Sequence, residues 1–253
     1  MPRQARQPSQ SGIYHLMIRG INKQSIFEDD ADRKKFMWCL QHYKEVSQYA
    51  IYGYCLMDNH VHLLIKEGLE PIAKSVKRIG VSYVSWFNQK YGRCGHLFQD
   101  RFKSEAVETN EYFLIVLRYI HQNPIKIGKE QKLETYPWSS YPEYSKMSRL
   151  IDIDFVLGMF SPKREVAVNM FKEFMNEKSA DNAIMVYSIN KLTDQEAKAV
   201  IQKLTQLTIL TELQTMEKEK RNELLRQIKK SEGISTRQIA RLTGMTQSII
   251  ARA

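Results

Sequence analysis

The segment YCLMDNHVHLLIKE, residues 54–67, places His60 and His62 two positions apart inside an apolar run. Alternate side chains of a β-strand point to the same face, so the two imidazoles are expected to lie side by side. Neighbouring imidazoles are good ligands for a divalent cation. A histidine pair in a strand also occurs as ordinary core or surface, and these two residues alone leave both interpretations open.

A second candidate group lies in TNEYFLIVLRYIHQNPIKIG, residues 109–128. Tyr119 and Asn123 are four positions apart, which places them one turn apart on one face of a helix. The amide oxygen of Asn123 is a suitable ligand for a hard cation such as Mg²⁺ or Mn²⁺. The alternative, which the spacing alone favours, is a core helix whose tyrosines reach toward the surface.

The elements that must position these residues follow from the apolar periodicity. Alternation predicts strands at 12–20, 50–57 and 60–67, with a turn and one or two short strands within 95–109. Apolar residues at helical spacing predict helices at 29–49, 70–92 and 109–128. Pro124 is expected to end the last helix. Strands with helices between them predict an α+β fold, a sheet covered on one face by helices.

The pattern of the sequence changes near residue 148, because long helical segments at 151–177 and 193–230 make up most of the chain from there on. The last stretch has two short helical patterns around Gly244, as in a helix-turn-helix, whose second helix would read duplex DNA through Gln247 and Ser248. Short helix-glycine-helix pairs also occur in ordinary bundles. The predicted domains are residues 1–147, a helical linker region at 148–192 and a helical domain at 193–253.

The composition limits the classes of function. The 38 Lys and Arg against 28 Asp and Glu give a net charge of +10, which favours a polyanionic partner, nucleic acid first. A solvated basic surface is the alternative. The three cysteines stand at unrelated spacings, which argues against a disulfide framework and favours the reducing cytoplasm. No apolar run approaches the ~20 residues of a membrane helix, so no membrane partner is expected.

Five blocks, in this order, resemble the single-tyrosine HUH transposases, which include insertion-sequence transposases and the REP-associated tyrosine transposases. The blocks are GIYHLMIRGINKQSIF, YCLMDNHVHLLI, GHLFQDRFK, VLRYIHQNPIKIG and YPWSSY. The resemblance covers about residues 12–145. It implies a ferredoxin-like antiparallel sheet with helices on one face, and it makes residues 1–147 the HUH catalytic domain.

The resemblance also implies the site. His60 and His62 become metal ligands for Mg²⁺ or Mn²⁺, and Tyr119 becomes the nucleophile. Asn123 stands where the family places a third ligand, although the insertion-sequence branch typically has Gln there. Such enzymes cut single-stranded DNA beside hairpins, form a 5′-phosphotyrosine intermediate and often act as homodimers. Three basic residues in or beside the blocks are expected to contact DNA phosphates, with plain surface charge as the alternative: Arg101, Lys103 and Arg118.

Three other functions are compatible with parts of the pattern. An HUH replication initiator or relaxase also uses a histidine pair and tyrosine, but the block order and the single candidate tyrosine disfavour it. A non-catalytic DNA-binding regulator derived from a transposase would rely on the helix-turn-helix, and the full set of His60, His62 and Tyr119 argues against lost catalysis. A metal phosphoesterase that uses water would need acidic ligands that the sequence does not offer.

Overall fold

The computed structural model describes residues 8–146, 148, 150–177, 194–231, 234 and 236–252. The chain divides into two compact units, Met1–Ala180 and Asp181–Ala253, and each is described by itself. None of the helices in these described parts is both long and apolar enough to span a bilayer.

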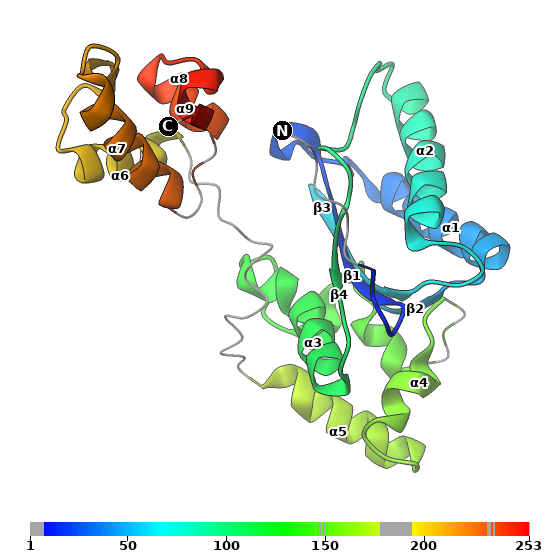
Figure 1. Ribbon diagram of the computed structural model, residues 1–253. Coiled ribbons are helices and arrows are strands. Elements are labelled where there is room, and N and C mark those ends of the chain that lie inside the picture. Colours follow the sequence, from blue (N-terminus) through cyan, green and yellow to red (C-terminus); the bar gives the residue numbers. More distant parts are fainter. Residues whose placement is uncertain are drawn as a thin grey trace. The chain divides into compact units, whose positions relative to one another are not determined.

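The first unit is built on a four-stranded antiparallel sheet (Figure 1). Its strands are β1 (Ile13–Arg19), β2 (Ala50–Met57), β3 (His60–Lys66) and β4 (Lys103–Ala106), in the spatial order β2-β3-β1-β4. The chain runs β1-α1-β2-β3-α2-β4, which is the connectivity of a ferredoxin-like fold. The predicted strands and the predicted antiparallel sheet are confirmed.

Helices α1 (Asp30–Ser47) and α2 (Ile72–Lys90) lie on one side of the sheet, as expected (Figure 1). A capping box between Asp29 and Asp32 begins α1. The two helices pack through Phe36 and Tyr83, whose ring centroids are 5.2 Å apart. The side chain of Ile18 points to this face, because it lines a cavity together with residues of α2.

The third helix, α3 (Asn110–Lys126), corrects the expectation that helices cover only one face, because it packs on the opposite side of β2 and β3 (Figure 1). A Cβ atom on Gly53 of β2 would lie 2.3 Å from Leu117 Cδ1, so α3 approaches the strand closely where a side chain is missing. The strands are buried at nearly every position, which requires cover on both faces. The side chain of Thr109 caps α3 by accepting a hydrogen bond from the amide of Tyr112.

Pro124 does not end α3, which continues to Lys126. A proline ring leaves the helical hydrogen bonds of the following residues intact, and the amide of Ile127 still donates to the carbonyl of Asn123 at 3.3 Å. The helix therefore ends about one turn later than the sequence pattern predicts.

Helices α4 (Ile153–Gly158) and α5 (Arg164–Asn176) belong to the first unit, where α4 contacts β2 and α5 contacts α3. Phe155 of α4 stacks on Tyr52 of β2 with ring centroids 4.7 Å apart. The predicted boundaries at 147 and 192 remain predictions, and residues 178–193 lie outside the described part. Among the residues of this unit that the structure describes, there are also three short 3₁₀ helices: Ile21–Lys23, Leu133–Thr135 and Tyr141–Ser145.

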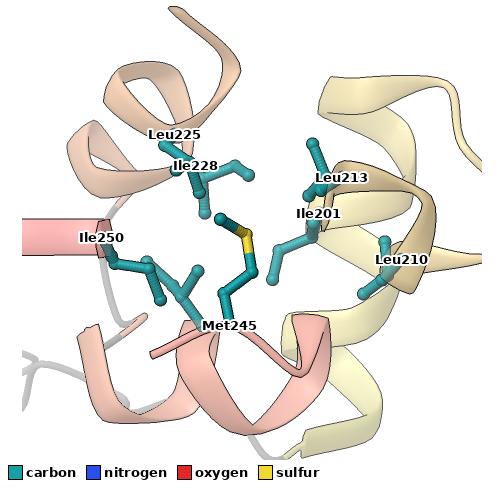
Figure 2. Packing of buried hydrophobic residues seen from close by; sticks show 8 residues of the cluster. Ile201, Leu210, Leu213, Leu225, Ile228, Met245 and Ile250 are labelled. Carbon is teal, nitrogen blue, oxygen red and sulfur yellow. The ribbon is translucent and has the colours of Figure 1, made fainter. Parts of the chain in front are cut away.

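The described residues of the second unit, which begin at Asp194, form helices around an apolar core. They are α6 (Asp194–Thr205), the 3₁₀ helix η5 (Leu210–Gln214), α7 (Lys218–Lys230), α8 (Thr236–Thr243) and α9 (Gln247–Arg252). Figure 2 shows aliphatic side chains and Met245 converging from these helices. The continuous helical segment predicted at 193–230 is divided into α6, η5 and α7. Gly244 takes a φ of +70° between α8 and α9, a conformation that favours glycine.

Candidate active site

The register of the sheet gathers polar side chains on the face that α3 covers. Met17 stands opposite His62, and Arg19 stands opposite His60. Directly opposed residues share a face, so His15, two positions before Met17, lies on this face too. The ring centroids of His60 and His62 are 5.0 Å apart, and those of His15 and His62 are 5.2 Å apart.

Tyr119 of α3 reaches this group within the same chain. Its ring packs edge-on against His62, with centroids 5.5 Å apart, and against His15 at 5.8 Å. The side chain is only 7% exposed. Lys126 places its Nζ 4.7 Å from the centre of the same ring, which adds positive charge at the site. The phenol and the imidazoles, which stand far apart in sequence, therefore form one cluster.

Asn123 lies one helical turn after Tyr119, and its side-chain nitrogen donates to the Tyr119 carbonyl at 2.9 Å. This bond uses the nitrogen and leaves the amide oxygen as the atom able to bind a cation. Burial raises the pKa of Tyr119, a hydrogen bond from Asn123 opposes that shift, and the charge of Glu105 reinforces it. The phenol therefore carries its proton at neutral pH and needs activation to act as a nucleophile.

Each imidazole of the pair is held through its Nδ1 atom. His60 Nδ1 is 2.6 Å from the side-chain oxygen of Asn59, and His62 Nδ1 is 3.0 Å from Nε2 of His15. Burial, followed by the charge of Arg19, lowers the pKa of His60 to about 4. Burial and the neighbouring His60 keep the pKa of His62 well below its usual value. Both rings are therefore neutral at pH 7, which is the form that binds metal.

The donor set fits an open, substrate-binding metal site better than a closed structural one. Among the residues that the structure describes, no group of three or more His, Cys, Asp and Glu side chains could hold a metal ion. The residues that could hold such an ion are His60 and His62, with two nitrogens, and Asn123, one helical turn after Tyr119, with an amide oxygen. Mg²⁺ keeps several water molecules and binds substrate phosphates, so it does not require a complete protein cage.

The remaining predicted residues do not all lie at this site. Lys103 stands opposite Met17 in β4 and so lies on the same face as the imidazoles. Arg101 lines a cavity of about 590 Å³ with Ile18 and residues of α2, on the other face. Arg118 donates to Glu177 at 2.8 Å. The second unit holds the last two candidates, both exposed at the start of α9: Gln247 and Ser248.

Sequence reasoning missed three residues of the cluster. The sequence patterns did not single out His15, which is 2% exposed and lies within hydrogen-bond distance of His62. Glu105 of β4 places its Oε2 3.7 Å from His15 Nδ1. Arg19 has a buried Nε with no hydrogen-bond partner among the described residues. The sequence did show that His15, Met17 and Arg19 lie on one face of their strand, because they are two positions apart. Only the pairing of β1 with β3 shows that this is the face that carries His60 and His62.

Comparisons with known proteins agree with this architecture. Residues 9–123 match the family model described as "Transposase IS200 like". One solved structure, "Structure of the REP associates tyrosine transposase bound to a REP hairpin", is similar with a TM-score of 0.51 and 18% identity, over 61% of this chain and 90% of that chain. No curated protein matches the sequence. The matched region contains both imidazoles and the phenol, so the part of the chain that carries the candidate site is the part similar to the IS200-like transposases.

Proposed function

We propose that this chain is a transposase that nicks single-stranded DNA beside hairpins and joins strands through a 5′-phosphotyrosine on Tyr119. One observation carries the proposal: the Tyr119 ring packs against His62 at 5.5 Å, in a buried cluster of one chain. Burying polar side chains together costs stability, and a regulator that only binds DNA has no need of that arrangement.

The bond changes follow from the groups present. The phenolic oxygen of Tyr119 attacks a phosphodiester, forms an O–P bond and breaks the bond to the 3′ oxygen. That oxygen takes up a proton and leaves as a 3′-hydroxyl, while the 5′ phosphate stays on the tyrosine. A 3′-hydroxyl of another strand then attacks the same phosphorus and releases Tyr119. Strand joining therefore needs no external energy source.

We assign His60 and His62 as ligands of a divalent cation, Mg²⁺ or Mn²⁺, with Asn123 as the third protein ligand. A cation bound there supplies Lewis-acid stabilisation of the charge that builds on the phosphate oxygens. Arg19, opposite His60, would contact the same phosphate. A guanidinium beside a cation site is repelled by it, and a bound anion between them removes that repulsion.

The proposed substrate is DNA with a hairpin, because the similar solved structure is described as bound to a REP hairpin. Lys103 shares the face of the imidazoles and would contact the DNA backbone. Arg101 and Arg118 are left out of this proposal, because one lies on the other face and the other is paired with Glu177. The homodimer predicted from the resemblance remains a proposal that sedimentation of the full chain would test.

For the second unit we propose duplex DNA binding through α8 and α9. The two short helices are separated by Gly244, and Gln247 and Ser248 are exposed at the start of α9. This is the arrangement that a recognition helix requires. If the unit binds DNA and the first unit has no activity, the chain is instead a regulator.

A denaturing gel separates these functions. The full chain is incubated with Mg²⁺ and hairpin DNA whose 3′ end, downstream of the cut, is labelled. The proposed enzyme leaves label covalently attached to protein, and Tyr119→Phe abolishes this product. Tyr43→Phe is the matched control, because Tyr43 lies on α1, on the other side of the sheet.

The other possible results of this experiment identify the alternative functions. A water-using phosphoesterase cuts the DNA without labelling protein, and a regulator binds it without cutting. Loss of label in Tyr43→Phe as well as in Tyr119→Phe would indicate damage to the fold instead of loss of the nucleophile. A replication initiator or relaxase also labels the protein, and it is distinguished by recognising an origin sequence in place of element or repeat hairpins.

A further inference from the structure

We propose that His15 and Glu105 hold His62 in the tautomer whose Nε2 carries no proton, the form able to bind a cation. The inference deepens the proposed function and rests on it. His15 is a positioning residue in this account, because it acts through His62 and does not contact the substrate. Nothing in the resemblance assigns a role to His15 or Glu105.

The contact between the two imidazoles is direct and shielded from water. His15 Nε2 and His62 Nδ1 are 3.0 Å apart, and the side chains are 2% and 1% exposed. The rings are nearly parallel, at 23°, with centroids 5.2 Å apart. A hydrogen bond between two neutral imidazoles needs one donor and one acceptor, so the proton on either ring decides where the other ring carries its own.

The position of Glu105 determines which of the two imidazoles donates this hydrogen bond and which accepts it. Its Oε2 lies 3.7 Å from His15 Nδ1, so the carboxylate favours a proton on that nitrogen. With its proton on Nδ1, the His15 ring presents a bare Nε2, which can only accept. His62 must therefore donate from Nδ1, and its Nε2 is left with a free lone pair. Tyr112 holds the carboxylate in place, because its hydroxyl donates to Glu105 Oε1 at 2.5 Å.

The neighbouring imidazole is arranged in the same way by a different group. His60 Nδ1 is 2.6 Å from Oδ1 of Asn59, and an amide oxygen can only accept. His60 therefore also carries its proton on Nδ1 and presents Nε2. Two unrelated partners, an asparagine in the β2–β3 turn and a histidine in β1, enforce one tautomer in both rings. Outer partners of this kind orient the histidine ligands of metal sites.

The first experiment reads the tautomer in the metal-free full chain. Nitrogen-15 NMR of labelled histidines at neutral pH is expected to show His62 protonated on Nδ1 and bare on Nε2. Glu105→Gln is expected to weaken this preference and give a mixture of tautomers. A wild-type His62 protonated on Nε2 overturns the inference. This outcome depends neither on metal binding nor on DNA cleavage.

The second experiment measures Mn²⁺ affinity by calorimetry. His15→Phe keeps a ring of similar shape but removes the acceptor, and is expected to weaken binding about 10–100-fold. His15→Gln restores an acceptor and should stay within about threefold of wild type. His42→Phe is the matched control, since His42 is exposed on α1. Unchanged affinity in His15→Phe overturns the inference.

The two experiments separate the failure of this inference from failure of the proposed function. If no form binds Mn²⁺ while His62 shows the expected tautomer, the metal part of the proposed function fails and the role of His15 and Glu105 stands. If His15→Phe does not fold, the wild-type spectrum and Glu105→Gln still decide the matter.

Discussion

The cores of the two units differ in what they bury. The first unit buries imidazoles, a phenol and an amide against one another, with His62 1% and Tyr119 7% exposed. The second unit has a core of aliphatic residues and Met245 (Figure 2). The hydroxyl groups of its buried threonines form hydrogen bonds within their own helices, where Thr205 and Thr243 donate to carbonyls one turn earlier.

Under the proposed function, this difference separates a core that serves chemistry from one that serves stability alone. A buried imidazole that keeps one nitrogen for a ligand lowers the stability of the fold unless the ligand is bound. The first unit maintains several such groups, whereas the second presents its candidate functional residues only on its surface. Mutations should therefore affect catalysis and duplex DNA binding through different units, and this expectation can be tested.

The largest expected effect is that of His60→Ala. Loss of one of the two proposed imidazole ligands should reduce covalent labelling of the protein at least about a thousandfold, because charge stabilisation at the phosphate would be lost. Hairpin binding, measured by fluorescence anisotropy, should stay within about threefold of wild type. Equal loss of binding and labelling would show that the comparison between chemistry and binding does not hold.

Acid should destabilise the first unit before the second. Burial lowers the folded-state pKa of His60 to about 4 and of His121 to about 3, below the ordinary value of about 6.5. The unfolded chain then binds more protons, so stability present above pH ~6.5 is lost as the pH falls toward 4, by on the order of a few kcal/mol. All six histidines precede residue 122.

The two units can be observed separately in this experiment. The three tryptophans lie in the first unit, so their fluorescence reports its thermal unfolding alone. Amide exchange in α7 reports the second unit. There, Arg241 and Gln238 hydrogen bonds lower the pKa of Asp194, so the stability it contributes is lost only when the pH falls through the acidic range of a carboxyl group. Simultaneous loss of both units near pH 6 would contradict the comparison.

Arg19→Gln should reduce the rate of covalent labelling about 10–100-fold, because one charged contact to the phosphate is removed. Arg19→Lys should restore part of the rate, since it keeps the charge but loses the planar fork. Arg78→Gln removes the same charge at an ion pair with Glu70 and serves as the control. If the two Gln variants are slowed equally, net charge and not the position of Arg19 explains the effect.

The smallest effect is expected for Gln247→Ala in α9. Loss of one base contact should weaken sequence-specific duplex binding at least about fivefold, as measured in electrophoretic mobility shifts. Hairpin labelling should remain unchanged, because Gln247 lies in the second unit. The buried neighbour Ile250 is unsuitable as a control, so exposed Thr246→Ala is used instead. Unchanged duplex binding in Gln247→Ala would leave α9 without its proposed role.

Local periodicity was sufficient to predict the strands and the helices α1, α2 and α3, but not the division of the helical segment at 151–177 into α4 and α5. The alternation that puts His60 and His62 on one face and the helical spacing of Tyr119 and Asn123 depend only on neighbouring residues. The extent of the helices was less predictable. Pro124 restricts the residue before it, but packing of α3 on the sheet held the helix for a further turn.

By itself, then, the sequence determined the periodic elements, the basic charge and the candidate pairs within each element. The tertiary structure alone decided that α3 lies on the imidazole face and that His15, Arg19 and Glu105 join the cluster. The physical reason is that strand register and helix placement depend on contacts between residues far apart in the chain, which local spacing does not specify.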